Sequence, residues 1–160
     1  MSYNTIKIKK YVDIVEEYPA DAAIFPGSLV EVNETSEVKV HATVGGNVLP
    51  MFALEDELQG KGIDDAYAAG DRVQCWIPNR GEVVLAILAD GASVEEGDFL
   101  ESNGAGYLQA HTPDAGSQDS IYQSAIVGIA LENMDASADS SGQDVGLGYG
   151  ANKRIRVRIL

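Results

Sequence analysis

The chain has 160 residues, of which 45% are hydrophobic, and its formal net charge at pH 7 is −14. A chain of this length and apolar content can bury a full hydrophobic core, which excludes an intrinsically disordered protein. The negative charge argues against nucleic acid as a partner, because phosphate binding needs Lys and Arg side chains. No run approaches the roughly 20 apolar residues of a membrane span, so no membrane partner is expected.

The first 20 residues predict an extended N-terminal arm that precedes a single β-rich domain over residues 21–160. Lys and Ile alternate over residues 6–9, and the stretch lacks the apolar centre of a signal peptide. A lone cysteine, Cys75, offers no internal disulfide, and we expect the chain to stay in the compartment where it is made. Tyrosines within a basic stretch are typical of an arm that lies along a neighbouring subunit. The expected contact residues in the arm are Tyr3, Lys7, Lys9, Lys10, Tyr11 and Tyr18.

Period-two alternation between turn residues predicts a series of short strands along the rest of the chain. Three turns stand out: Gly45-Gly46 and Asn103-Gly104 are hairpin signals, and residues 78–81 turn one strand back into the next. Such a series predicts an all-β fold, a small β-barrel or β-sandwich with little helix. The expected strands span residues 28–32, 37–44, 71–77, 82–88, 98–102, 107–110, 121–131 and 154–160.

Two regions break the strand pattern. Residues 54–59 predict one or two helical turns that end at Gly60 and Gly62. Residues 134–150 are rich in Asp, Ser, Ala and Gly and predict a long loop.

The basic residues are concentrated near the two ends of the chain. All 25 Asp and Glu residues lie between these ends. The ends are either solvated strands with basic outer faces or segments that meet an acidic surface, on the chain's own body or on a partner. Seven of the eleven basic residues form the two groups: Lys7, Lys9 and Lys10, then Lys153, Arg154, Arg156 and Arg158.

No residue pattern indicates an active site. His41 and His111 have no nucleophile at a suitable spacing, and Cys75 has no zinc-ligand spacing to either. Residues 135–144 resemble a calcium loop, but the glycine is misplaced and the closing Glu is missing. We therefore predict a protein that is not an enzyme, with no catalytic residue, cofactor or metal site. Trp76 is either a core aromatic residue or an interface anchor.

Residues 48–78, VLPMFALEDELQGKGIDDAYAAGDRVQCWIP, resemble a stretch of the head decoration (cement) proteins of tailed bacteriophages. The similarity covers most of the chain from about Phe25 onward. Further segments in the same order also resemble that family: residues 26–30, 89–104, 126–131 and 154–159.

The resemblance implies a small, β-tulip-like structural protein of the virion, made in the host bacterial cytoplasm. It would bind the outer capsid surface as an oligomer, often a homotrimer, and would stabilise the capsid by clamping neighbouring major capsid protein subunits. The arm residues and Trp76 would make capsid or inter-subunit contacts. The alternative is a carbohydrate- or receptor-binding β module on the particle, with Trp76 and Tyr107 as its aromatic set. A hydrolase accessory domain is a third possibility.

Overall fold

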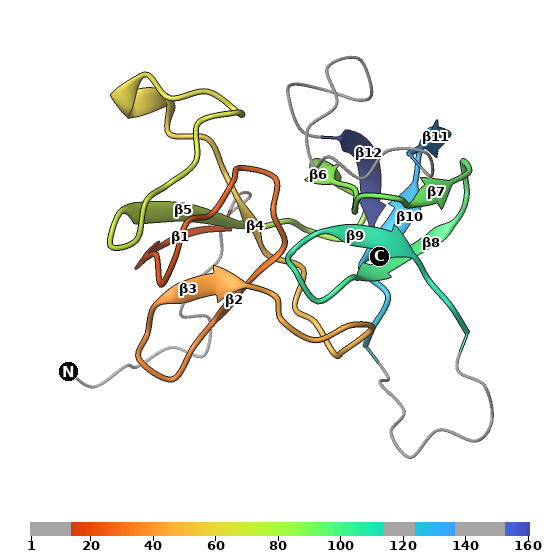
Figure 1. Ribbon diagram of the computed structural model, residues 1–160, viewed down its shortest axis with the longest axis horizontal. Coiled ribbons are helices and arrows are strands. Elements are labelled where there is room, and N and C mark those ends of the chain that lie inside the picture. The colour runs from red at the N-terminus through yellow and green to blue at the C-terminus, as the bar shows by residue number, and fades with distance from the viewer. Residues whose placement is uncertain (1–13, 114–123, 137–152) are drawn as a thin grey trace, which may run out of the picture.

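The computed structural model describes residues 14–113, 124–136 and 153–160 (Figure 1). Within these ranges the only helical element is the 3-10 turn η1, so the expected all-β class is confirmed. The strands of the described ranges form open sheets, so the expected barrel alternative is wrong for this part of the chain. The elements are β1 (Ile14–Pro19), β2 (Val30–Val32), β3 (Val38–Val40), β4 (Phe52–Ala53), η1 (Glu57–Gln59), β5 (Arg72–Ile77), β6 (Val83–Ile87), β7 (Ser93–Val94), β8 (Phe99–Ser102), β9 (Leu108–Ala110), β10 (Gly128–Ala130), β11 (Met134–Asp135) and β12 (Arg154–Ile159).

The largest sheet has five strands in the order β6-β12-β10-β8-β9, and all neighbours are antiparallel. The inner face of this sheet carries one hydrophobic core. Leu100, Ile155 and Val157 are fully buried there, as expected for one side of alternating strands. Strand β12 lies between β6 and β10, so the C-terminal strand ties together segments that are distant in the sequence.

A second core lies with the three-stranded sheet β1-β5-β4 and the β2-β3 ribbon. Figure 1 shows these strands on one side of the molecule and the five-stranded sheet on the other. Val38, Val73 and Cys75 are fully buried in this second core. Strand β1 pairs with β5 along its whole length, from Ile14 opposite Ile77 to Pro19 opposite Arg72. Residues 14–19 of the expected arm are therefore a strand of the protein's own sheet.

The three expected turns have different outcomes. Asn103-Gly104 joins β8 to β9 as an antiparallel hairpin, and Gly104 has a φ of 80°. Residues 78–81 form the expected turn, in which Glu82 N donates to Asn79 O at 3.1 Å. The strands on either side do not pair as expected, because β5 pairs with β1 and β4 while β6 pairs with β12. The hairpin expected at Gly45-Gly46 was wrong, since β3 pairs with β2 across the preceding turn.

The expected helical segment is one short turn. In η1 the Asp56 side chain accepts a hydrogen bond from Gln59 N, and Gly60 ends the turn at a φ of 72°. Strand β11 occupies the start of the expected 134–150 loop, and residues 137–150 lie outside the described residues. Over the described ranges, no helix is long and apolar enough to cross a membrane.

Candidate functional site

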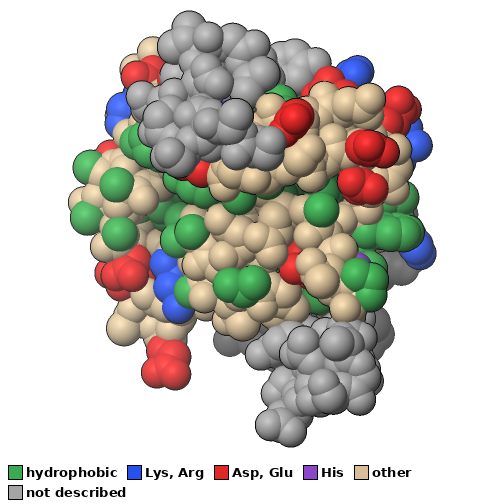
Figure 2. All heavy atoms as spheres, turned by 45° about the vertical axis from the view of Figure 1, so that its right-hand side comes forward, with side chains coloured by type: hydrophobic (Ala, Val, Ile, Leu, Met, Phe, Trp, Pro, Cys, Tyr) green, Lys and Arg blue, Asp and Glu red, His purple; other side chains and the backbone are tan. Residues whose placement is uncertain are grey.

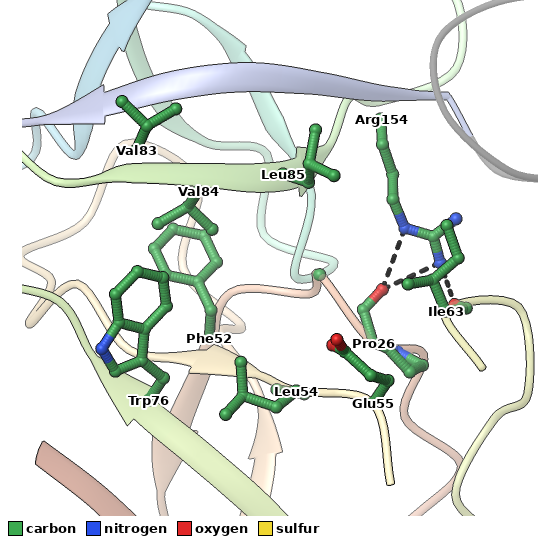
Figure 3. Close-up of a pocket in the computed structure, with 12 residues that line it drawn as sticks. Pro26, Phe52, Leu54, Glu55, Ile63, Trp76, Val83, Val84, Leu85 and Arg154 are labelled. Carbon is green, nitrogen blue, oxygen red and sulfur yellow. Dashed lines mark hydrogen bonds between the residues drawn. The ribbon is translucent and has the colours of Figure 1, made fainter. Parts of the chain in front are cut away.

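A recess of about 250 Å³ lies between β6 and the three-stranded sheet (Figure 3). Its walls are mostly apolar, and Glu55 and Arg154 lie at one end in the close-up. Such a surface can hold apolar side chains of a partner, but it brings no nucleophile and base together. The apolar lining includes Phe52, Leu54, Trp76, Val83, Val84 and Leu85.

Trp76 packs as one of its two expected alternatives, a core aromatic residue, and its role as an interface anchor stays a prediction. In β5, Val73 and Cys75 face the second core, so Trp76 lies on the opposite face of the strand. Its cross-strand partners there are Val15, which is 40% exposed, and buried Phe52. Trp76 packs against the first core and also lines the recess, which makes it half-buried.

Arg154 closes the far end of the recess. Its side chain is almost completely buried, and its guanidinium donates two hydrogen bonds to Pro26 O, at 3.2 Å from Nε and 2.9 Å from Nη2. Nη2 also donates to Ile63 O, and Nη1 lies 2.8 Å from Asp64 Oδ1. The planar guanidinium thus holds two loops against β6 and β12.

Three C-terminal basic residues form ion pairs with acidic residues of the same chain. Besides the Arg154–Asp64 pair, the fully buried Lys153 ammonium lies 2.9 Å from Asp90 Oδ1. Arg156 Nε lies 3.2 Å from Glu132 Oε2. For these three residues the interpretation that basic residues meet the chain's own acidic body is confirmed. Lys7, Lys9 and Lys10 lie outside the described residues.

The outward face of the five-stranded sheet shares Val83 and Leu85 with the recess and is partly uncovered. Val83, Leu85 and Phe99 are 45%, 38% and 48% exposed. Arg156 and Arg158 are also exposed and lie directly opposite Leu85 and Val83 on β12. Residues 83–88 are all apolar, but β6 is at the sheet edge and only one of its faces meets the core.

The structure brings one Ser–His–carboxylate chain together that the sequence did not indicate. His41 Nδ1 lies 2.8 Å from Ser102 Oγ, and His41 Nε2 lies 3.2 Å from Asn47 O and 3.8 Å from Glu31 Oε2. Ser102 is fully buried, and its hydroxyl accepts a hydrogen bond from Gly104 N. A buried hydroxyl is out of reach of a substrate, so these contacts link β8 to the segment after β3 rather than form a catalytic triad.

Two further titratable side chains, His111 and Cys75, lie in surroundings that do not form an active site. His111 Nδ1 lies 2.5 Å from the buried Glu101 carboxylate, and Gln109 also donates to that carboxylate. Burial raises the pKa of the Cys75 thiol to about 12, so the reactive thiolate is absent at neutral pH. Among the described residues, no group of His, Cys, Asp and Glu side chains could hold a metal ion.

The expected contact residues are only partly described. Tyr18 lies in β1, is half-buried and packs against the second core. Trp76 lines the recess described above, whereas Tyr107 does not, so the two proposed glycan-binding aromatic residues share no recess here. Tyr3, Lys7, Lys9, Lys10 and Tyr11 lie outside the described residues. The contact roles stay predictions.

Comparison with known proteins gives a likeness of fold. No protein-family model matches the sequence, and no curated protein matches it. Among solved structures, the chain is similar to the N base of the head fiber protein gp8.5 of bacteriophage phi29, with a TM-score of 0.53. The match covers 92% of this chain and 94% of the phi29 chain at 12% sequence identity. The two chains therefore share a fold over nearly their whole lengths.

Proposed function

We propose that this chain is a structural protein of a tailed-phage virion that binds the outer surface of the head. The main support for this proposal is the fold that 92% of the chain shares with the base of a phage head fiber. The resemblance of residues 48–78 to phage head decoration proteins is an independent line of support. The fold and the sequence thus point to the same kind of particle by different routes.

Within this proposal the protein is not an enzyme but stabilises the capsid by clamping neighbouring subunits of the major capsid protein. Two surfaces suit contact with a protein: the apolar recess with Trp76, and the exposed apolar and arginine side chains on β6 and β12. A homo-oligomer, with a trimer as the expected form, would engage several capsid subunits at once. Simultaneous engagement multiplies the modest free energy of each single contact.

Co-sedimentation with empty, expanded capsids tests this function. The full chain should pellet with expanded capsids and not with unexpanded ones, and it should raise the temperature at which the capsids rupture. A variant that lacks residues 1–10 should show reduced occupancy, since the basic arm is proposed to touch the lattice or a sister subunit. A folded full chain with no affinity for expanded capsids would overturn the proposed function, and undiminished binding by the truncated chain would remove the arm from it.

A further inference from the structure

The outward surface of β6 and β12 combines apolar and basic side chains. We call it the arginine face and define it by Val83, Leu85, Phe99, Ile129, Arg156 and Arg158. We propose that this face docks, head to tail, onto an acidic surface of a second copy of this chain. The inference rests on the proposed function, because it assigns a surface to the oligomer expected there.

The strand register places the members of the arginine face side by side. Val83 is opposite Arg158, Arg158 is opposite Ile129, and Ile129 is opposite Phe99. Directly opposite residues in a sheet project on the same side, so these four form one row across β6, β12, β10 and β8. Leu85 and Arg156 lie opposite each other two residues along the same strands.

The face has the composition of an interface centre. Three large apolar side chains are exposed among the arginines. A strand that only faces solvent needs no such side chains, whereas the centre of a protein interface typically has them. Arg80, in the turn before β6, is also exposed, and the next residue's backbone, Gly81 N, bonds to Ile159 O at the end of β12. Arginine with its apolar surroundings is a frequent source of binding energy between proteins.

Charge complementarity favours a second copy as the occupant. The chain carries a net charge of −14, and exposed carboxylates such as Glu34, Glu57, Glu95 and Glu96 lie on its turns and loops. In Figure 2, acidic side chains are spread over several parts of the visible surface, while Lys and Arg are few. Arg158 forms no ion pair within the part of the chain that the structure describes, so it is open to a carboxylate of another copy.

The same charges favour one arrangement of the two copies over another. A two-fold contact centred on the arginine face would place the face of one copy against the same face of the other, with like charges opposed. A head-to-tail contact instead places the arginines against the acidic surface of the next copy. Repeated head-to-tail contacts close into a ring when the rotation between copies allows it.

Light scattering on the full chain tests the arginine face. We expect an oligomer that weakens as salt is raised, because exposed charge pairs are screened. Leu85→Lys and Arg158→Glu should each weaken self-association at least tenfold. Leu58→Lys and Arg72→Glu are matched controls, because Leu58 and Arg72 are exposed on η1 and β5, outside this face, and their oligomers should persist. Circular dichroism and thermal melting establish that every variant is folded.

Three results would overturn the inference. A monomeric wild-type chain would do so, as would Leu85→Lys and Arg158→Glu variants that keep the wild-type mass. An Arg158→Glu variant that stays oligomeric but no longer co-sediments with expanded capsids would assign the face to the capsid protein instead, since Arg158, unlike Leu85, does not line the recess. The wild-type oligomer could also be disrupted by these variants and yet fail to bind capsids. That result would support the arginine face as the contact between copies and would overturn the proposed function.

Discussion

Each end of the β6–β12 strand pair has an apolar residue of β6 opposite an arginine of β12, but the two ends have opposite surroundings. At one end, Ile87 and Arg154 are directly opposite each other and both are buried, 3% and 1% exposed. At the other end, Val83 and Arg158 are also directly opposite, and both are exposed. All four side chains project from the same face of the sheet.

The difference comes from what covers each end. The loops that contain Pro26 and Ile63 lie over the first end, and the Arg154 guanidinium binds their carbonyl groups (Figure 3). No described segment covers Val83 and Arg158 in the same way. Burial of an arginine here depends on carbonyl groups from distant loops, because a buried guanidinium needs partners for its donors.

The largest expected effect is on Arg154. Arg154→Met should lower the free energy of unfolding by about 3–5 kcal/mol, because the buried carbonyls of Pro26 and Ile63 lose their donor. Arg158→Met, the same change at the uncovered end, should change it by less than about 0.5 kcal/mol. Urea-induced unfolding of both variants measures the difference. Equal losses in the two variants would mean that the covering loops do not set the two ends apart.

Glycine substitutions test the covering loop itself. Gly27 has a φ of 88°, and an added Cβ would lie 2.8 Å from Leu85 O and 3.2 Å from Arg154 Nε. Gly27→Ala should destabilise the fold by about 2–4 kcal/mol, from backbone strain and from displacement of the loop. Gly81 is the matched control at the uncovered end, since its φ is 93° and no atom lies within 4 Å of its added Cβ. Gly81→Ala should cost only the strain, about 1 kcal/mol.

Thermal denaturation followed by circular dichroism ranks the two glycine variants. A Gly81→Ala variant that is as unstable as Gly27→Ala would show that backbone strain, and not contact with β6, determines both losses.

The burial of Cys75 and Tyr67 also predicts how the free energy of unfolding responds to alkaline pH. In the second core, desolvation raises the pKa of Cys75 from 9.0, and of Tyr67 from 10.0, to about 12 in each case. Between pH 9 and 12 the unfolded chain loses these protons while the folded chain keeps them. Stability contributed by these groups is therefore complete below pH 9 and falls as the pH rises towards 12.

Urea unfolding at a series of pH values measures this loss, with the Cys75→Ala, Tyr67→Phe double variant as the control. The slope of unfolding free energy against pH should be shallower in the control above pH 9. Identical slopes would contradict the assignment of the alkaline loss to these two covered groups.

The sequence predicted those parts of the fold that alternation and turn chemistry determine locally. Strands β5, β6, β8, β9 and β12 match expected segments within two residues, and Asn103-Gly104 forms the expected hairpin. Strand pairing was less predictable, because partners are chosen by packing between distant segments. The turn after β5 illustrates this, since β6 joins β12, about 70 residues away, rather than β5.

The candidate site was predictable to a smaller extent. Trp76 stood out from the sequence as a core residue or an interface anchor; it packs against the first core, and the anchor role stays a prediction. The alternating arginines of β12 gave no sign that Arg154 would be buried and Arg158 exposed, because that depends on loops some 90 and 130 residues earlier in the chain. The contact between His41 and Ser102, 61 residues apart, was likewise not visible in any local motif.

The smallest expected effect is on Arg156, which lies between the two ends. It is opposite Leu85, its side chain is 50% exposed, and its Nε is 3.2 Å from Glu132 Oε2. Exposed ion pairs contribute little, because water and salt screen the attraction and both side chains lose freedom. Arg156→Gln should therefore change the free energy of unfolding by about 0.5 kcal/mol or less, as measured by urea unfolding at low and high salt.

The backbone gives a further reason for a small effect. Arg156 N donates to Glu132 Oε1 at 2.7 Å, and this bond survives any change of the Arg156 side chain. Glu132→Ala removes both the ion pair and the backbone contact, so it should cost more than Arg156→Gln. If Arg156→Gln were as harmful as Arg154→Met, the middle of β12 would belong to the covered end, and the boundary of the arginine face would have to move towards Arg158.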